Sequence, residues 1–278
     1  MEALQQLSKE ALQAHIGELE ALYEQGKAKG LKLDMSRGKP GPEQLDLTLE
    51  MLDCVNARDG YQTANGIDTR NYGLLDGIPE AKAIFADILG VQPENVIVGG
   101  NSSLNMMFDY IATAFAKGIC GHEPWARQGA VKFLCPAPGY DRHFAITEYF
   151  GIEMLTVPLL DNGPDMELVE KLVKDPLVKG IWCVPMYSNP DGITYSDETV
   201  RRMAALQPAA ADFRIMWDNA YAVHHLTDTP DTLLNIYKEA AAMGKEDMVI
   251  EFASTSKISF PGSGIAAIAT SRNNLEDI

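Results

Sequence analysis

From about residue 79 to its end, the chain alternates short apolar runs with longer stretches of helical periodicity. Strands that alternate with helices form crossover units, so the pattern predicts an α/β fold with a mainly parallel, seven-stranded sheet flanked by helices. The expected strands are residues 96–98, 131–135, 152–157, 180–185, 214–217, 248–253 and 265–269. The expected helices lie near residues 79–89, 103–117, 141–150, 165–174, 197–206 and 230–243.

The N-terminal part of the chain has a different character. Apolar residues at helical spacing predict a helix over residues 3–29, with glycines at its end. The Pro- and Gly-rich stretch 34–42 that follows predicts irregular backbone. We therefore expect residues 1–47 to form an N-terminal helix and arm, and residues 48–278 to form a large domain.

Charge and composition exclude several classes of partner. Lysine and arginine number 23 against 39 aspartate and glutamate, and the net charge of −16 argues against nucleic acid and anionic membranes as partners. No apolar run approaches the ~18 residues of a membrane span, and the first residues lack the features of a signal peptide. Cys135 and Cys183 fall inside apolar runs, and no cysteines show paired spacing, so we expect buried, reduced thiols and a cytoplasmic protein.

Polar or conformationally special residues follow five of the predicted strands. In a parallel sheet these strand ends share one edge, where ligands bind. Ordinary turn chemistry explains any one of these loops but explains the set of five poorly. The segments are Gly99-Gly100-Asn101-Ser102-Ser103, Pro136-Ala137-Pro138-Gly139-Tyr140, Tyr187-Ser188-Asn189-Pro190-Asp191-Gly192, Asp218-Asn219-Ala220-Tyr221 and Ser254-Thr255-Ser256-Lys257.

Lys257 is the most informative of these residues. A lysine that follows an apolar strand and three small hydroxylated residues is poorly placed as a solvated surface charge. It is well placed as a desolvated amine that forms a Schiff base with a carbonyl, such as the aldehyde of pyridoxal phosphate (PLP). We therefore expect a desolvated amine at this position.

Two other strand ends suit the remaining parts of such a cofactor. Asp218 would pair with a protonated pyridine nitrogen, although a helix or turn cap is an alternative. Residues 99–103 offer hydroxyls and backbone N–H groups at a helix start, which suits a phosphate. The alternative there is a plain N-cap formed by Asn101 or Ser102.

Three further side chains could complete the set of contacts. Tyr221 lies three residues after Asp218 and can reach the same ring. Both Tyr221 and Asn189 can donate a hydrogen bond to the phenolic oxygen of the cofactor. Tyr140 could stack on the ring, or it could simply pack in its Pro-Gly-Tyr turn.

Three other patterns point to different chemistry, and each lacks the context it needs. Ser254–Lys257 matches the Ser-x-x-Lys of β-lactamases, but their Ser-Asp-Asn and Lys-Thr-Gly elements do not occur in the chain. Residues 262–267 match the dinucleotide pattern G-x-G-x-x-A, but they precede a strand instead of following one. His224-His225 has no evident third ligand, so we expect no metal site.

Several motifs together resemble the fold-type I PLP enzymes, the aspartate aminotransferase superfamily. Those shared with the superfamily are Asn189-Pro190-x-Gly192, Asp218-x-Ala220-Tyr221 and Ser254-x-Ser256-Lys257. Others resemble a bacterial subgroup of aspartate aminotransferases, related to the aminotransferase domain of MocR-type regulators. These are Ser36-Arg37-Gly38-Lys39-Pro40, Asn71-Tyr72-Gly73-Leu74-Leu75-Asp76-Gly77, Pro138-Gly139-Tyr140-Asp141-Arg142-His143-Phe144 and Ser254-Thr255-Ser256-Lys257-Ile258-Ser259-Phe260-Pro261-Gly262.

The resemblance implies pyridoxal 5′-phosphate as the cofactor and a role for each strand end. Lys257 would hold the cofactor as a Schiff base and then shuttle a proton. Asp218 would pair with the pyridine nitrogen, and Tyr140 would stack on the ring. Tyr221 and Asn189 would bond the phenolic oxygen.

It also implies contacts at the phosphate, at the substrate and between subunits. The resemblance implies that the phosphate is bound by residues with hydroxyl or amide groups, namely Asn101, Ser102, Ser103 and Ser254. Ser256 would also bind the cofactor. Gly38 and Asn189 would lie against the substrate. Tyr72 would reach the phosphate of a neighbouring subunit, which implies a homodimer, and residues 1–47 would contribute to a small domain or to the dimer contact.

Two departures from the family pattern affect the expected site. Many relatives carry an arginine seven residues after the lysine, where it pairs with the phosphate, and Gly264 occupies that place here. Family members also continue into a small C-terminal domain with an arginine that grips the substrate carboxylate. Because the chain stops at Ile278, we expect a C-terminally truncated member without that domain.

The function implied is transamination from aspartate to 2-oxoglutarate, which yields oxaloacetate and glutamate. One alternative is another fold-type I PLP enzyme, such as a decarboxylase or lyase, because a scaffold does not fix a reaction. A second is a truncated chain that binds PLP without turnover. A third is the sensing domain of a regulator, which would need a basic winged-helix module for which the first 30 residues leave no room.

Overall fold

The computed structural model describes residues 4–33, 39–58 and 60–278 and divides the chain into two units, Met1–Asp46 and Leu47–Ile278. The first unit contains η1 (Leu4–Gln6), α1 (Lys9–Ala28) and α2 (Pro42–Asp46). Ser8 caps α1 by accepting a hydrogen bond of 3.2 Å from the backbone N–H of Ala11. None of the described residues of α1 is buried. That this unit contributes to a small domain or to a dimer contact stays a prediction.

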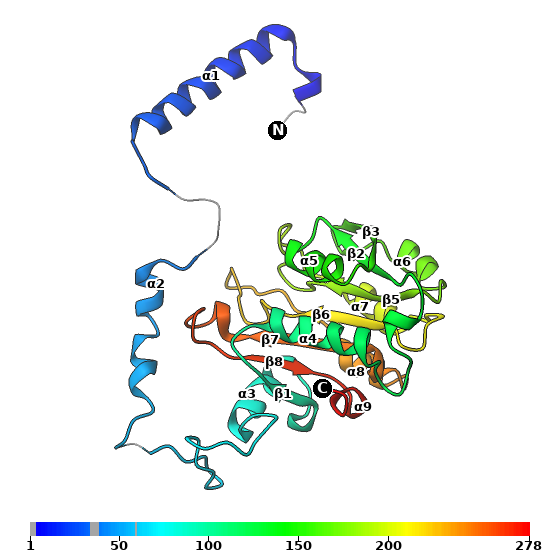
Figure 1. Ribbon diagram of the computed structural model, residues 1–278. Coiled ribbons are helices and arrows are strands. Elements are labelled where there is room, and N and C mark those ends of the chain that lie inside the picture. Colours follow the sequence, from blue (N-terminus) through cyan, green and yellow to red (C-terminus); the bar gives the residue numbers. More distant parts are fainter. Residues whose placement is uncertain (1–3, 34–38, 59) are drawn as a thin grey trace. The chain divides into compact units, whose positions relative to one another are not determined.

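The second unit alternates strands and helices as the sequence pattern predicts (Figure 1). Its strands are β1 (Val96–Val98), β2 (Lys132–Ala137), β3 (Glu153–Leu160), β4 (Gly163–Pro164), β5 (Val178–Cys183), β6 (Arg214–Asp218), β7 (Val249–Ser254) and β8 (Ala266–Ala269). Its α-helices are α3 (Pro79–Leu89), α4 (Ser103–Ala116), α5 (Asp141–Tyr149), α6 (Met166–Leu172), α7 (Asp197–Ala204), α8 (Ile236–Ala241) and α9 (Arg272–Leu275). Short 3₁₀ turns are η2 (Leu49–Asp53), η3 (Pro93–Asn95), η4 (Trp125–Arg127), η5 (Glu246–Met248) and η6 (Thr255–Lys257).

The strands form one sheet in the order β1-β8-β7-β6-β5-β2-β3-β4. The pairs β3–β2, β2–β5, β5–β6 and β6–β7 are parallel, so the sheet is mainly parallel as expected. The eighth strand, which the sequence pattern did not predict, is the two-residue β4, and it pairs antiparallel with the end of β3. It is too short to form an apolar run. Because β8 is antiparallel to both β1 and β7, those two strands run in one direction. The carboxyl ends of β1, β7, β6, β5 and β2 therefore lie along one edge.

One predicted helix is much shorter in the structure. The sequence pattern predicts a helix over residues 230–243, whereas α8 begins only at Ile236. Asn235 is its N-cap, and its side-chain oxygen accepts a hydrogen bond of 2.8 Å from the backbone N–H of Lys238. The leucines before Asn235 pack on the core from irregular backbone.

Helices cover both faces of the sheet and give it two apolar cores. Helices α4 and α5 cover one face, and α6, α7 and α8 cover the other, where α3 packs over β1, β8 and β7 (Figure 1). Side chains alternate between these faces along each strand. On β6, Met216 lies in the core under α4 and α5, whereas Ile215 and Trp217 lie in the opposite core. Asp218 therefore belongs to the α4 and α5 face.

Buried polar groups hold the two cores at the amino-terminal side of the sheet. Lys179 of β5 and Asp212 form an ion pair of 2.7 Å with both side chains almost fully buried. Trp125 and Gln128 donate to the second oxygen of Asp212, at 2.9 and 2.8 Å. A buried ion pair with every oxygen bonded is costly to break from one side.

All four cysteines are free, and Cys135 and Cys183 are buried as predicted. Burial raises the pKa of the Cys135 thiol to about 12. Among the described residues, no helix combines the length and the apolar composition that a bilayer crossing requires.

Replacing Gly180 with alanine is expected to destabilise the second unit strongly. A Cβ there would overlap the Phe133 ring and lie 2.6 Å from the carbonyl oxygen of Arg214. Overpacking of this kind costs about 3 kcal/mol, which urea denaturation would measure. Gly262→Ala is the control, because a Cβ there meets nothing within 4 Å, and equal stability of the two variants would contradict the account.

Candidate functional site

The strand-end segments singled out from the sequence surround one cleft at the carboxyl edge of the sheet. Its walls include three apolar residues, Leu104, Val184 and Ala220. Its other lining residues are Ser102, Ser103, Tyr140, Asn189, Asp218, Tyr221, Ser254, Ser256 and Lys257. The structure thus brings together nine of the residues that the sequence pointed to.

The strand order explains why distant segments meet at this cleft. The backbone N–H of Gly99 donates to the carbonyl of Ala266 at 2.8 Å, and Ala266 donates to the carbonyl of Gly100 at 2.7 Å. These bonds attach the segment after β1 to the start of β8, beside the end of β7. The Ser256 hydroxyl then donates to the carbonyl of Asn101 at 3.3 Å. The start of α4 and the turn that carries Lys257 are therefore adjacent.

The start of α4 can receive an anion. Ser102 occupies the N-cap position, but its side chain makes no capping hydrogen bond, so a plain N-cap does not explain it. Ser102 and Ser103 line the cleft beside the positive end of a 14-residue helix. Asn101 does not line the cleft, and its amide lies 3.5 Å from the carbonyl oxygen of Gly262.

Asp218 is a buried carboxylate at the end of β6, with only 4% of its surface exposed. Its Oδ2 lies 2.9 Å from Nε2 of His143. Its Oδ1 has no hydrogen-bond partner among the described residues. A buried, half-satisfied carboxylate is costly unless a cation or donor completes it. Asp218 therefore presents an acceptor for a cationic group in the cleft.

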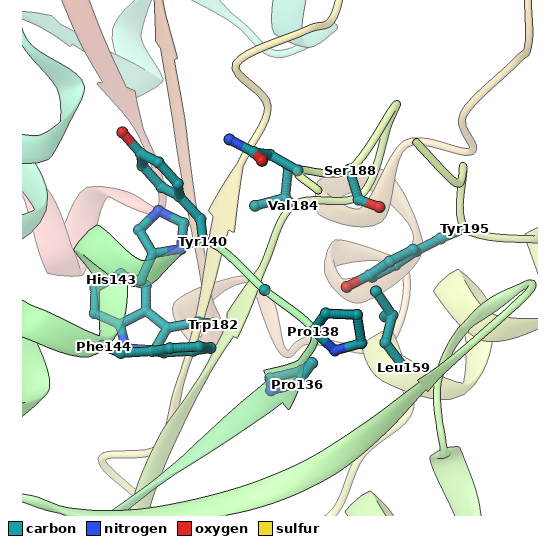
Figure 2. Close-up of a pocket in the computed structure, with 12 residues that line it drawn as sticks. Pro136, Pro138, Tyr140, His143, Phe144, Leu159, Trp182, Val184, Ser188 and Tyr195 are labelled. Atoms are coloured by element: carbon teal, nitrogen blue, oxygen red, sulfur yellow. The ribbon is translucent and has the colours of Figure 1, made fainter. Parts of the chain in front are cut away.

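His143 supports Asp218, and reasoning from the sequence assigned it no role. Its ring is 1% exposed and stacks on Trp182, with centroids 4.7 Å apart and planes at 14°. Trp182 in turn donates to the Thr147 hydroxyl at 2.8 Å. Figure 2 shows the His143 ring between Tyr140 and Trp182. Because His143 lies in the first turn of α5, three residues after its N-cap Tyr140, helical spacing was the available signal.

Beyond Tyr140 the cleft adjoins a small cavity of about 20 Å³. Tyr140, Val184 and Asn189 line both spaces. Tyr195 and Ser188 lie across the small cavity from His143 (Figure 2). Tyr140 meets the His143 ring edge-on at 5.1 Å, which orients the phenol at the boundary.

Tyr221 remains a hydrogen-bond donor in the cleft. Burial raises the pKa of its hydroxyl, and the nearby Asp218 and Tyr140 raise it further. An interaction with the Asn189 side chain lowers the same pKa. Since burial is the largest of these effects, the phenol keeps its proton at neutral pH.

Lys257 differs from expectation in its exposure. The sequence predicts a desolvated amine at the end of a strand, whereas the Lys257 side chain is exposed. The reason is that β7 ends at Ser254, and the turn η6 then carries Lys257 beyond the sheet. Lys257 still lines the cleft, and Ser254 is buried beneath the turn. The amine is therefore a reachable nucleophile at the rim of the cleft.

Gly264 allows the backbone to pack closely against this turn. A Cβ at Gly264 would overlap the Thr255 hydroxyl and lie 3.5 Å from the backbone nitrogen of Ser256. The same Thr255 hydroxyl accepts a hydrogen bond of 2.9 Å from the N–H of Ile265. A longer side chain at Gly264 would therefore displace the turn that presents Lys257.

Two residues singled out from the sequence lie elsewhere. Tyr72 is 99% exposed and lines a separate depression formed by residues 67–78. Gly38 lies outside the described residues. No group of three His, Cys, Asp or Glu side chains suited to a metal ion occurs in the described part of the chain.

The cleft can receive three different chemical groups at once. An anion fits the hydroxyls and N–H groups at the start of α4, and a cationic nitrogen fits the open oxygen of Asp218. An electrophilic carbon would meet the amine of Lys257. A single ligand that carries all three groups would satisfy the cleft.

Comparisons with known proteins point to one family. The family model described as aspartate amino-transferase matches residues 7–278. A Mycolicibacterium smegmatis protein, named only as an aminotransferase, is 51% identical over 256 residues, which is 91% of this chain and 60% of that protein. The aspartate aminotransferase of Corynebacterium glutamicum is 45% identical over 273 residues, which is 98% of this chain and 63% of the relative.

Solved structures of aminotransferases share the fold of this chain. The crystal structure of an aspartate transaminase from Corynebacterium glutamicum superimposes with a TM-score of 0.90 at 45% identity, over 98% of this chain and 64% of that one. An α-aminoadipate aminotransferase from Thermus thermophilus shares the fold, with a TM-score of 0.62 at 20% identity over 85% of this chain and 54% of that one. The chain spans less than two thirds of the length of each of these relatives.

Proposed function

The chain belongs to the aspartate amino-transferase family, and we propose that it is the cofactor-binding part of a PLP-dependent aminotransferase. One observation carries the proposal. Asp218 is buried with one oxygen on His143 and the other without a partner, in a cleft that also holds Lys257 and the start of α4. Bound PLP supplies an aldehyde and an electron-accepting ring. Its phosphate, ring nitrogen and aldehyde match the three groups that the cleft can receive.

The residues of the cleft have complementary roles in this proposal. Asp218 holds a proton on the pyridine nitrogen, and His143 donates to the same carboxylate. Tyr221 and Asn189 donate to the phenolic oxygen, while Tyr140 covers the ring. Lys257 would hold the cofactor through its amine, and, once the substrate amine displaced it, the freed amine would move a proton at the substrate carbon.

The phosphate is held mainly without a fixed cation. Ser102 and Ser103 offer hydroxyls and N–H groups at the start of α4, and Ser254 adds a third hydroxyl. The Ser256 hydroxyl donates to the carbonyl of Asn101, and the Asn101 amide donates to the carbonyl of Gly262. These two contacts hold the loop before α4 against the turn that carries Lys257. The close packing of Gly264 supports the use of hydroxyls where an arginine would not fit.

The favoured substrates are aspartate and 2-oxoglutarate, which would yield oxaloacetate and glutamate. The support is the 45% identity to a protein named aspartate aminotransferase. Because the chain spans only 63% of that relative, the whole activity is itself part of the proposal. Titration with PLP, followed by a coupled assay for oxaloacetate with aspartate and 2-oxoglutarate, tests it. Well-folded protein that takes up no PLP would contradict it.

We also propose a homodimer in which Tyr72 reaches the cleft of the neighbouring subunit. Tyr72 is 99% exposed and Leu75 is fully exposed, an unusual position for two large side chains in one loop. The Tyr72 hydroxyl would add a donor at the phosphate of the partner. A monomeric PLP-loaded protein in sedimentation measurements would contradict this part of the proposal.

Replacing His143 with phenylalanine is expected to weaken PLP binding about tenfold, since a hydrogen bond to a charged group is worth about 1.5 kcal/mol. Phenylalanine keeps a ring against Trp182 but leaves both oxygens of Asp218 without a donor. Fluorescence titration with PLP measures the effect.

His143→Gln is the matched control, because its amide can still donate to Asp218. It should recover most of the lost affinity if His143 acts by positioning and neutralising that carboxylate. Equal affinity of the phenylalanine variant and the wild type would remove His143 from the account.

A further inference from the structure

A second cavity lies on the opposite face of the sheet from the cleft. Its volume is about 310 Å³, within the range of pockets that bind small molecules. It lies between the end of α3, the strands β6 and β7, and the segment before α8. No residue lines both this cavity and the cleft. Because side chains alternate along β6, Asp218 faces the cleft while Trp217 and Asn219 face the cavity.

Glu251 of β7 is the most unusual group in this cavity. It is 3% exposed, and its Oε1 has no hydrogen-bond partner among the described residues. Burial raises the pKa of this carboxyl to about 8, as expected for an acid without a neighbouring cation. The side-chain oxygen of Asn219 is also buried without a partner in the described part of the chain. Two buried oxygens in this cavity therefore lack a donor among the described residues. A cation that binds beside Glu251 would lower the pKa of its carboxyl and hold it as a carboxylate.

The other lining residues favour a cation with an apolar body. Asp87 and Asp231 add two more acidic side chains, and none of the described residues that line the cavity is lysine or arginine. Trp217 lies directly opposite Glu251 in the strand register, so an indole ring adjoins the carboxyl. Aromatic rings attract cations. Leu89, Leu233 and other aliphatic side chains form the rest of the wall.

We propose that this cavity binds an organic cation, a primary ammonium ion on a short aliphatic chain. The ammonium group donates to Glu251 and Asn219, and the aliphatic chain packs against Trp217 and the leucines. A primary ammonium has three N–H donors, enough for both orphaned oxygens. An anion would face three acidic side chains with no lysine or arginine among the described lining residues, and a bare metal ion finds no cluster of ligands there.

The test uses n-butylammonium chloride and n-butanol, which have the same aliphatic chain with and without the charge. The full chain is first treated with borohydride, so that no cofactor aldehyde remains to react with an amine. Binding of each probe is then measured by calorimetry and by saturation-transfer NMR. We expect n-butylammonium to bind at least ten times more tightly than n-butanol. Equal binding of the two probes, or no binding of n-butylammonium, would overturn the proposal without any variant.

Two variants locate the site. Glu251→Gln keeps the shape of the side chain but cannot ionise when a cation binds, and it should weaken n-butylammonium binding at least tenfold. Asp228→Asn removes one negative charge from an exposed position outside the cavity and should leave the affinity unchanged. Unchanged affinity in the Glu251 variant, or an equal loss in both variants, would assign the binding to another site or to general charge. The outcome does not depend on whether PLP occupies the cleft.

Discussion

Lys257→Arg is expected to abolish covalent attachment of PLP and to lower the rate of aspartate transamination by about 10⁴-fold, the upper range for a positioned acid–base group. Arginine keeps the positive charge and the length of the side chain, so the electrostatic attraction for the phosphate survives. It cannot form the Schiff base, and its guanidinium does not give up a proton near neutral pH. Noncovalent PLP binding should therefore remain measurable by titration while borohydride leaves no cofactor on the protein.

Lys117→Arg is the matched control. Lys117 is exposed, and its ion pair with Asp277 is one that arginine can replace. This variant should attach PLP as the wild type does and should not alter the proposed aspartate transamination. Full attachment of PLP to the Lys257 variant would show that another lysine is the nucleophile.

Asp218→Asn is expected to weaken PLP binding about a hundredfold, because losing one partner of a buried charge pair costs about 3 kcal/mol. The stability of the cofactor-free chain should change by less than about 1 kcal/mol, since asparagine can still accept from His143 and no internal cation loses its partner. If Asp218 were a purely structural carboxylate, the variant would lose stability and keep its affinity for PLP. Fluorescence titration with PLP and urea denaturation measure the two effects separately.

Asp212→Asn gives the opposite result if the account is right. Asp212 is as deeply buried, but it is paired with Lys179 and accepts from Trp125 and Gln128. It precedes the start of β6, whereas the cleft lies at the end of that strand. Its loss should lower stability by about 3 kcal/mol and leave a buried lysine unpaired. PLP affinity of the folded protein should not change. If both variants lose stability alike, Asp218 is a structural carboxylate.

The predicted strands agree with the observed ones because buried parallel strands are continuous apolar runs. Residues 248–253 read as a strand from Met248 onward, and β7 is Val249–Ser254. Since parallel strands share their carboxyl edge, the residues after each run could be grouped before any coordinates were known. That rule placed Asp218, Ser102 and Lys257 in one cleft.

Other features depend on packing between distant segments or on local turns and caps that apolar spacing does not describe. The exposure of Lys257 results from the turn after β7, which apolar spacing does not describe. The contact between His143 and Asp218 joins residues 75 positions apart. Glu251 sits inside a run that otherwise reads as core, and only its neighbours in space reveal that its Oε1 has no partner among the described residues. The late start of α8 follows from Asn235 as a cap, which lies inside the range 230–243 that was predicted as helix.

Reduction with borohydride followed by peptide mass mapping tests the central claim most directly. The chain is loaded with PLP, reduced and digested, and the peptide that carries the reduced cofactor is identified. The account predicts one modified site, Lys257, in the peptide that includes Ser254 and Ser256. Attachment to any other lysine, or a folded chain that carries no cofactor after loading, would contradict it.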